Sequence, residues 1–393
     1  MSSWRPAKKF ICWQHISPEI LHYKKMTMRL LLVIAGVLLI LTILWDAFET
    51  IILPRRVTRR VRLARGFYRS IWTPWALIAK RVHNRKRRDE YLALFGPLSL
   101  LMLLTMWAVG LIIGYALVQW SVHSPLRVSA ESVSLGTYLY LSGVTFFTLG
   151  YGDVTAMSAL GRAIEVMEAA TGFGLLAVVI GYLPVLYQSF SRREVNISLL
   201  DARAGSPSSA TELLRRYGAS GNLDEIDRLL HDWEHWSAEL LESHLSYPVL
   251  CYFRSQHDNQ SWLAALTTVL DTCALVMVGI DGVSVWQARL TFAIARHAVV
   301  DIAQIFRTAP TSVSCCATRL APQELSRVRG MLAANGTPLL DGAEAERRLL
   351  ELRLMYEPYV VALSDFLLMT LPPWILPPDA VDNWKTSAWG RIQ

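Results

Sequence analysis

The segment from Thr148 to Asp153 contains residue types whose spacing suits the coordination of a cation by backbone oxygens. It reads Thr-Leu-Gly-Tyr-Gly-Asp. Gly150 and Gly152 can take the left-handed conformation without a Cβ penalty, so the backbone can alternate and point successive carbonyl oxygens the same way. A row of such oxygens can replace the water shell of a dehydrated cation. The Thr148 hydroxyl would add an oxygen at one end, and the Asp153 carboxylate would concentrate cations at the other.

This hexapeptide resembles the selectivity-filter signature of the potassium channel family, which is usually Thr-Val/Ile-Gly-Tyr-Gly-Asp. The resemblance implies an ion-selectivity filter made of Thr148, Leu149, Gly150, Tyr151 and Gly152. It also implies that Asp153 lies at the outer mouth of a pore. Leu149 replaces the usual Val or Ile, but this position gives the pore its carbonyl and the surrounding protein its side chain. We therefore expect selectivity to survive the change.

The flanking segments have the lengths that such a loop requires. Two uncharged stretches, within Leu98–Trp120 and Arg162–Phe190, are long enough to span a bilayer. Between them, Ser132 or Ser134 can cap a helix over Leu135–Phe147 that is too short to span. Its C-terminal dipole would point at the ion path. Non-helical backbone at membrane depth is tolerated where it lines a cavity, so this order of elements predicts a pore.

Gly172 is a candidate gating hinge, because the family resemblance implies a glycine about 20 residues after the last filter glycine. Close packing of the inner helix through a small residue is the alternative. Residues 172–177 also satisfy Gly-x-Gly-x-x-Ala. No strand precedes them and no helix begins there, which argues against dinucleotide binding.

The composition is that of a membrane protein, since 53% of the 393 residues are hydrophobic. The formal charge of +7 is unevenly divided: residues 1–190 hold 21 Lys and Arg against 9 Asp and Glu, whereas residues 191–393 hold 18 against 23. The basic excess thus accompanies the apolar runs, where cytoplasmic loops accumulate Lys and Arg. We expect no nucleic-acid partner. The expected fold is an all-α, polytopic membrane protein with a potassium-channel-like pore domain and a cytoplasmic α-helical domain.

Five segments are predicted: an N-terminal tail (1–27), an N-terminal transmembrane helix (28–53), a basic linker (54–90), the pore domain (91–192) and a helical domain (195–393). The charge of the linker predicts that it is cytoplasmic, which puts the N-terminus outside and the helical domain in the cytoplasm. The protein is therefore expected to be multi-pass in a cell membrane, plasma or inner.

The basic linker has two interpretations. Arg56, Arg59, Arg62 and Arg65 recur every third residue, as in a voltage-sensor helix. A single span precedes them, however, so the counter-charge helices of a sensor are missing. We favour a cytosolic helix whose cations meet anionic lipid headgroups near residues 55–88. An interfacial helix is predicted to follow, with an apolar face of Phe67, Ile71, Trp72, Trp75 and Ile78.

The C-terminal half predicts helices and no strands. Residues 262–286 are strongly apolar but are interrupted by Asp271, so we expect core helices of a soluble bundle. Membrane contact by 262–286 or 357–376 remains an open alternative. Glu344–Leu371 is predicted to be one long helix, which ends at the following prolines.

No catalytic motif is evident in this half, so we expect a protein that is not an enzyme and has no cofactor beyond permeant K⁺. His231 and His235 are four residues apart and could bind a metal, but no third ligand is evident. A solvated helix face is the favoured interpretation. His297 and Asp301 predict a helix-surface pair.

The leading hypothesis is a passive potassium-selective channel, assembled as a homotetramer because one chain carries one filter loop. The helical domain would assemble the pore or regulate it through an unknown ligand. A weakly selective cation channel is one alternative. A ligand-binding or enzymatic C-terminal module with the pore as its output is another. The complete Gly-Tyr-Gly-Asp argues against a transport subunit of an uptake complex.

Overall fold

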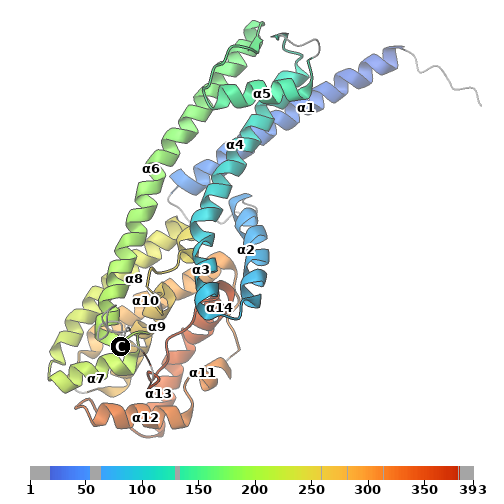
Figure 1. The fold of residues 1–393 in the computed structure, drawn as a ribbon. Coiled ribbons are helices and arrows are strands. Elements are labelled where there is room, and N and C mark those ends of the chain that lie inside the picture. The colour runs from blue at the N-terminus through green and yellow to red at the C-terminus, as the bar shows by residue number, and fades with distance from the viewer. Residues whose placement is uncertain are drawn as a thin grey trace, which may run out of the picture. The chain divides into compact units, whose positions relative to one another are not determined.

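The computed structural model describes residues 18–53, 63–128, 133–257, 259–280, 282–312, 314–378 and 380 (Figure 1). Two compact units divide the chain. Unit 1 combines the described residues up to Glu49 with Leu104–Val179, and unit 2 combines Thr50–Leu103 with the chain from Ile180 onward. Arg56, Arg59 and Arg62 of the basic linker lie outside the described residues.

Nearly all regular structure in the described residues is helical, which confirms the all-α prediction. The N-terminal half contains α1 (Pro18–Ala47), η1 (Phe48–Ile52), α2 (Leu63–Arg81), α3 (Arg85–Ala93), α4 (Phe95–Ser121), α5 (Leu135–Phe146) and α6 (Ala159–Ala204). The C-terminal half contains α7 (Ala210–Ser220), α8 (Asp224–Ser246), η2 (Pro248–Tyr252), α9 (Trp262–Gly279), α10 (Val285–Phe306), α11 (Ser314–Arg319), α12 (Pro322–Ala333), α13 (Ala343–Leu354) and α14 (Glu357–Leu367). Two short strands, β1 (Leu126–Arg127) and β2 (Thr155–Ala156), pair in antiparallel register.

Four helical segments among the described residues are long and apolar enough to cross a bilayer: Met26–Ile52, Arg85–Ser121, Ala159–Ala204 and Trp262–Gly279. The first three expose most of their apolar windows, as lipid-facing or subunit-facing helices do. The fourth, α9, differs because 89% of its window is buried by other parts of the protein. Its apolar character is thus explained by a core position within unit 2, as the sequence predicts.

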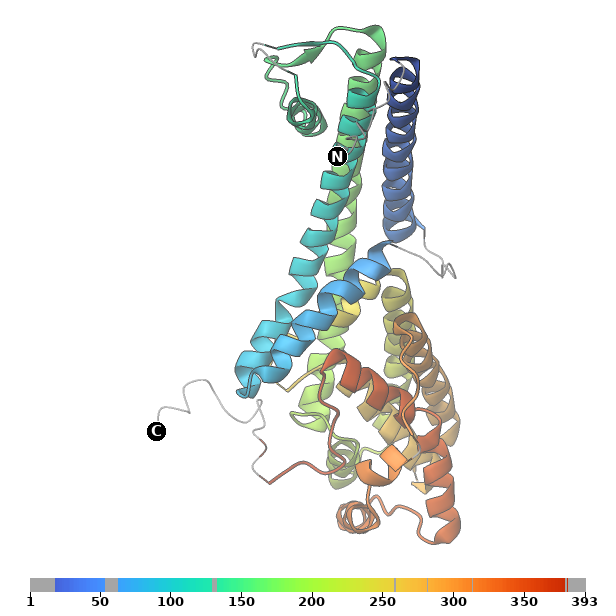
Figure 2. The ribbon, with the colours of Figure 1, turned by 90° about the vertical axis from the view of Figure 1, so that its right-hand side faces the viewer.

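In unit 1, α1 packs against α4 through glycines (Figure 2). A Cβ atom on Gly36 would lie 2.9 Å from the carbonyl oxygen of Gly114, and one on Gly110 would lie 2.3 Å from Cδ1 of Ile43. Small residues let membrane helices approach closely, which is how they gain packing energy without a hydrophobic driving force. The first span is therefore fitted to the surface of α4.

A polar contact supports the same packing. The indole Nε1 of Trp107 on α4 donates a hydrogen bond of 3.0 Å to Oδ2 of Asp46 on α1, and both side chains are buried. Acidic residues in membrane helices are costly unless they have a partner. The partner here lies on the neighbouring helix, so the bond specifies which face of α1 meets α4.

In unit 2, the aromatic face of α2 belongs to the protein core. Trp72 is buried, and its Nε1 donates a 3.0 Å hydrogen bond to the carbonyl of Phe366. Trp75 stacks on Tyr91 with ring centroids 4.5 Å apart. The prediction that these two tryptophans form an interfacial face is therefore wrong, because the apolar stripe packs on protein. Ile78 remains exposed.

The long helix predicted over Glu344–Leu371 is also wrong. The structure has two helices, α13 and α14, separated at Met355 and Tyr356. Pro358 lies in the first turn of α14. A proline has no N–H and its ring opposes the preceding helical turn, so it is tolerated at a helix start and breaks a helix interior.

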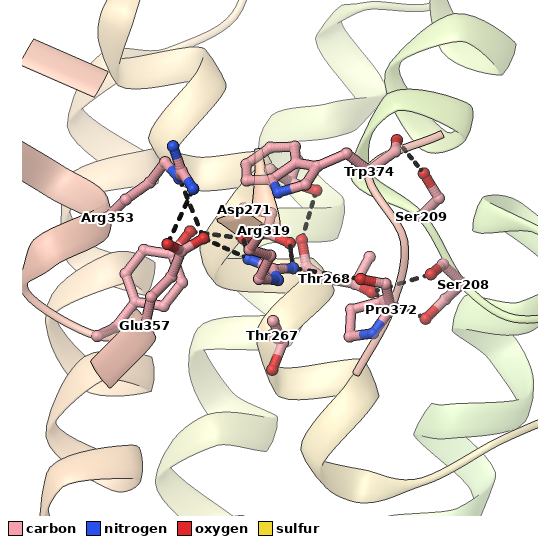
Figure 3. Close-up of polar contacts among 12 residues, drawn as sticks. Ser208, Ser209, Thr267, Thr268, Asp271, Arg319, Arg353, Glu357, Pro372 and Trp374 are labelled. Atoms are coloured by element: carbon pink, nitrogen blue, oxygen red, sulfur yellow. Dashed lines mark hydrogen bonds and ion pairs between the residues drawn. The ribbon is translucent and has the colours of Figure 1, made fainter. Parts of the chain in front are cut away.

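A buried network of charges connects these C-terminal helices (Figure 3). Arg319, at the end of α11, donates to Asp271 on α9 at 2.8 Å and to Glu357 on α14 at 2.6 Å. Arg353 on α13 donates to the second oxygen of Glu357 at 3.0 Å. Both guanidinium groups lie over the ring of Trp374, at 5.1 and 5.6 Å from its centroid. Two cations and two anions thus compensate each other in the core.

The geometry keeps Arg319 charged. Burial alone would lower its pKa, but the carboxylates of Asp271 and Glu357 outweigh this effect and raise the pKa of Arg319. The Tyr356 hydroxyl donates to Asp271, so this carboxylate has a further partner. Since the network connects α9, α11, α13 and α14, we infer that it fixes their order in unit 2.

Glu357→Gln should destabilise unit 2 strongly. Removing one member of a buried ion pair costs about 3–5 kcal/mol, because the remaining charges are left without compensation. Thermal or denaturant unfolding of the full chain, followed by tryptophan fluorescence, measures the effect. The matched control is Glu344→Gln, which removes an exposed partner of Arg347 and should leave the midpoint nearly unchanged. Equal midpoints for the two variants would contradict a stabilising role for the network.

Candidate functional site

The loop at Thr148–Asp153 follows a short helix, α5, as the sequence predicts. Ser134 is the N-cap residue, with extended backbone, and its N–H donates to the Thr137 hydroxyl at 3.2 Å. Ser132, the other predicted cap, lies outside the described residues. α5 has 12 residues, so at 1.5 Å per residue it is about 18 Å long and too short to span.

The end of α5 passes directly into the loop. The Phe147 N–H donates to the carbonyl of Gly143 at 3.1 Å, and the Leu149 N–H donates to that of Val144 at 2.9 Å. These bonds hold the first loop residues against the last turn of the helix. The negative end of the α5 dipole is therefore adjacent to Thr148.

The loop backbone alternates between ordinary and left-handed conformations. Thr148, Gly150 and Gly152 have φ values of +55°, +61° and +77°, whereas Leu149 and Tyr151 do not have positive φ. The two glycines therefore occupy the conformations for which the sequence suggested them. Thr148 is unusual, because a β-branched residue rarely adopts positive φ.

Within the single chain, backbone conformation and not crowding requires glycine at these two positions. A Cβ atom built on Gly150 or Gly152 meets no atom within 4 Å in the described part of the chain. The left-handed conformation costs an L-amino acid with a Cβ about 1–2 kcal/mol. A substitution would thus act by shifting the direction of the carbonyls.

Asp153 is positioned by a residue that sequence reasoning missed. The Tyr140 hydroxyl, on α5, donates a 2.9 Å hydrogen bond to Oδ2 of Asp153. The two residues are 13 positions apart, and they meet because the loop returns along the helix from which it came. No local periodicity could have predicted this contact.

The segment after the loop is anchored at several points. β2 pairs with β1, and the Ala156 N–H donates to Oε1 of Glu165 at 3.0 Å. Arg162 Nε donates to the Ala156 carbonyl at 3.2 Å. The Tyr138 hydroxyl on α5 donates to the carbonyl of Ser124 at 2.8 Å. The C-terminal end of the loop is therefore tied to both flanking segments.

A buried polar contact joins the three helices around the loop. The Ser142 hydroxyl on α5 lies 2.8 Å from the carbonyl of Ile112 on α4 and within hydrogen-bonding distance of the Glu168 carboxyl on α6. Glu168 is fully buried. It was also missed from sequence, because Arg162 and Glu165 precede it and make it look like part of a polar helix start.

Gly172 packs against the end of α5. A Cβ atom on it would lie 2.1 Å from the carbonyl oxygen of Phe146, and α6 continues without a break through this position. The structure thus supports the close-packing interpretation of this glycine. Its use as a gating hinge stays a prediction.

The histidine pairs belong to unit 2, whereas the loop belongs to unit 1. His231 and His235 are edge-to-face neighbours with ring centroids 4.8 Å apart. No group of three or more His, Cys, Asp or Glu that could hold a metal is present in the described residues. His297 and Asp301 form the predicted helix pair, with Nε2 and Oδ2 3.0 Å apart.

Large side chains around the loop are uncovered in the single chain. Phe147, Leu149 and Tyr151 are 58%, 53% and 66% exposed. An exposed cluster of large apolar side chains often marks an interaction surface. The loop is therefore suited to burial against further copies of the chain.

Comparison with known proteins agrees with this arrangement. A family model described as "Ion channel" matches residues 102–188, which include most of α4, all of α5, the loop and much of α6. Protein LctB of Bacillus caldotenax is 34% identical over 93 residues, covering 21% of this chain and 69% of that protein. The chain therefore belongs to the ion channel family of the two-transmembrane, potassium-channel type.

A longer but weaker match extends beyond this region. The Uncharacterized membrane protein YdjJ of Bacillus subtilis is 24% identical over 193 residues, covering 49% of this chain and 56% of that protein. The chain thus spans little more than half the length of this relative. No solved structure matches the chain.

Gly150→Ala and Gly152→Ala should each abolish cation selectivity or conduction, because the added Cβ opposes the left-handed backbone. Ion flux into liposomes containing the full-length variant measures this. Gly66→Ala is the matched control, since an added Cβ there meets no atom within 4 Å and the residue lies within helix α2. Normal selective flux through either filter variant would count against the backbone argument.

Tyr140→Phe should weaken cation capture at the mouth without unfolding the pore, because it frees the Asp153 carboxylate. We expect a several-fold lower flux at low ionic strength. The difference should fade as salt is added, since the Debye length falls to about 10 Å at 0.1 M. Tyr359→Phe, in unit 2, is the control. A salt-independent loss would argue instead for structural damage.

Proposed function

We propose that this protein is a potassium-selective channel that conducts K⁺ passively across a cell membrane. The observation that carries the proposal is the alternating backbone at Thr148, Gly150 and Gly152, placed after a short helix between two long apolar helices. This conformation turns successive carbonyls in one direction. Carbonyl oxygens are suited to K⁺ because they replace its hydration shell without introducing charge.

A single loop can surround an ion only in part, so the pore is proposed to be a homotetramer around one axis. The exposure of Phe147, Leu149 and Tyr151 supports this assembly, since neighbouring copies would cover them. In the tetramer, Thr148 would supply hydroxyl oxygens at the inner end and Asp153 a ring of carboxylates at the outer mouth. The four α5 helices would direct their negative ends toward the ion.

The proposed topology has the N-terminus outside and the helical domain in the cytoplasm. The basic residues of α2 and α3 support this orientation, because cytoplasmic segments next to spans are enriched in Lys and Arg. They are Arg65, Arg69, Lys80, Arg81, Arg85, Lys86, Arg87 and Arg88. Anionic lipid headgroups near residues 55–88 remain part of the proposal.

The helical domain is proposed to assemble or regulate the pore and not to catalyse a reaction. Its most prominent buried polar cluster, around Arg319, Asp271 and Glu357, is held together by internal ion pairs. Such a cluster stabilises packing and leaves no reactive group aimed at a substrate. A weakly selective cation channel is the second candidate, because residues outside the filter signature also set selectivity.

The deciding experiment is flux of K⁺ against Na⁺ through the full-length protein in liposomes. K⁺ flux should exceed Na⁺ flux by at least about an order of magnitude, the ratio that corresponds to 1.4 kcal/mol of discrimination. Similar fluxes would favour the weakly selective channel. The full chain is needed, because the aromatic face of α2 packs on the C-terminal helices and a truncation would expose it.

A binding measurement complements flux, because a closed channel conducts nothing. K⁺ should raise the melting temperature of the assembled protein more than Na⁺, since a ligand that binds only the folded state stabilises it. Gly150→Ala should remove this difference, and Gly66→Ala should retain it. If K⁺ and Na⁺ stabilise the wild type equally, the filter assignment is overturned.

A further inference from the structure

Unit 2 contains a cavity of about 740 Å³ that the proposed ion path does not use. Its walls are α3, the turn after α6 at Ser206 and Pro207, residues 254–257 and 259–261 before α9, and the segment 370–377 after α14. Sites for small ligands typically measure about 300–1,000 Å³. The cavity is therefore large enough for an organic molecule of metabolite size.

Among the described residues that line the cavity, basic side chains outnumber carboxylates. Arg85, Lys86 and Arg254 face Asp89 and the exposed Glu90. Asp89 is itself shared between Arg85 and Arg88, each at 4.0 Å. Within the described residues, neither Lys86 nor Arg254 has a carboxylate within ion-pair distance.

Arg254 is held in place by backbone groups. Its Nη1 donates to the carbonyl of Leu368 at 3.1 Å and its Nη2 to that of Leu367 at 2.5 Å. Burial lowers the pKa of Arg254 to about 10. A cation that is oriented, largely desolvated and not paired with a carboxylate is suited to receive an anion.

Two neighbouring polar atoms lack partners. The Ser255 hydroxyl oxygen and the Gln260 side-chain carbonyl oxygen are buried and make no hydrogen bond within the described chain. Both residues line the cavity. Buried polar groups are almost always hydrogen-bonded, to protein or to a bound molecule. Both oxygens are covered by protein, so a ligand could bond to them only if the two side chains turned toward the cavity.

A further part of the wall is apolar, and it adjoins the cationic part, since Arg85 donates to the Thr370 hydroxyl at 3.3 Å. The apolar part consists of Leu371, Pro372, Pro373, Ile375 and Pro377. Prolines fix the backbone of this segment, so the surface is largely pre-formed. A ligand with one charged end and one apolar face would match both parts of the wall.

We infer that this cavity binds a small, water-soluble organic anion. A phosphate or carboxylate group is held by Arg85, Lys86 and Arg254, and the apolar part of the molecule lies on residues 371–377.

Binding at this place would act on both helices of the pore. α3 ends at Ala93 and α4 begins at Phe95, while Ser206 and Pro207 closely follow the end of α6 at Ala204. The ligand thus contacts chain segments that continue into the outer and the inner helix. This regulatory consequence rests on the proposed channel function, whereas the binding site does not.

The binding test uses the full-length protein in phosphatidylcholine nanodiscs, titrated calorimetrically with inorganic phosphate in a low-chloride buffer. Saturable binding is expected. Adenosine 5′-monophosphate, which adds an apolar ring, should bind at least about tenfold more tightly, and adenosine alone should bind far more weakly. Arg85→Gln combined with Lys86→Gln should weaken phosphate binding about tenfold or more. Both side chains are exposed, so the variant should fold.

Arg87→Gln is the matched control, because Arg87 is an exposed cation of the same helix that does not line the cavity. It should leave binding unchanged. The site is overturned if phosphate does not bind saturably, or if Arg87→Gln weakens binding as much as the double variant. It is also overturned if Arg85 and Lys86 contribute only to the binding of phosphatidic acid in the nanodisc and not to the binding of soluble phosphate.

Flux measurements separate the site from its consequence. Adenosine 5′-monophosphate should change K⁺ flux in wild-type protein and not in the double variant. Binding without any change in flux would overturn the regulatory role and leave the site. Absence of selective K⁺ flux under all conditions, with phosphate binding intact, would overturn the proposed function alone.

Discussion

The structure of unit 1 depends on keeping a few residues of backbone in a conformation that most amino acids avoid. Thr148 carries this cost most directly, since a β-branched side chain is held at a φ of +55°. The cost, about 1–2 kcal/mol for an L-residue, is offset by hydrogen bonds from the loop to the last turn of α5. The Tyr140–Asp153 bond holds the other end. Contacts with the surrounding helices thus stabilise the left-handed backbone conformation of the loop.

The elements of the site were predictable because their signals are local. The glycine spacing at Gly150 and Gly152, the cap at Ser134 and the uncharged runs each report on a few neighbouring residues. Tyr140 and Glu168 could not be assigned, because their partners are defined by the path of the chain in space. Gly172 was singled out, but the choice between hinge and contact needed the distance to the Phe146 carbonyl.

Outside the site, the two errors have different causes. The apolar stripe on α2 predicts that Trp72 and Trp75 are buried, but it does not show whether they pack against lipid or against protein. In unit 2 it is protein. The prediction of one uninterrupted helix over Glu344–Leu371 overlooked Pro358. A proline inside a helix breaks it, so the sequence alone could have predicted this break. Asp271 shows the reverse case, in which an acid within an apolar run correctly indicated a buried helix with internal partners.

The bond between Trp107 and Asp46 has a consequence for how the chain enters the membrane during synthesis. α1 leaves the ribosome before α4, so Asp46 reaches the bilayer before its indole partner exists. An acid near the centre of a helix opposes insertion by about 2.5–3.5 kcal/mol, and less toward its ends. We expect α1 to insert fully into the bilayer only after α4 has been synthesised and inserted beside it. An isolated α1 segment carrying Asp46→Asn should therefore insert more completely than the native segment, and equal insertion would show that the two helices are integrated independently.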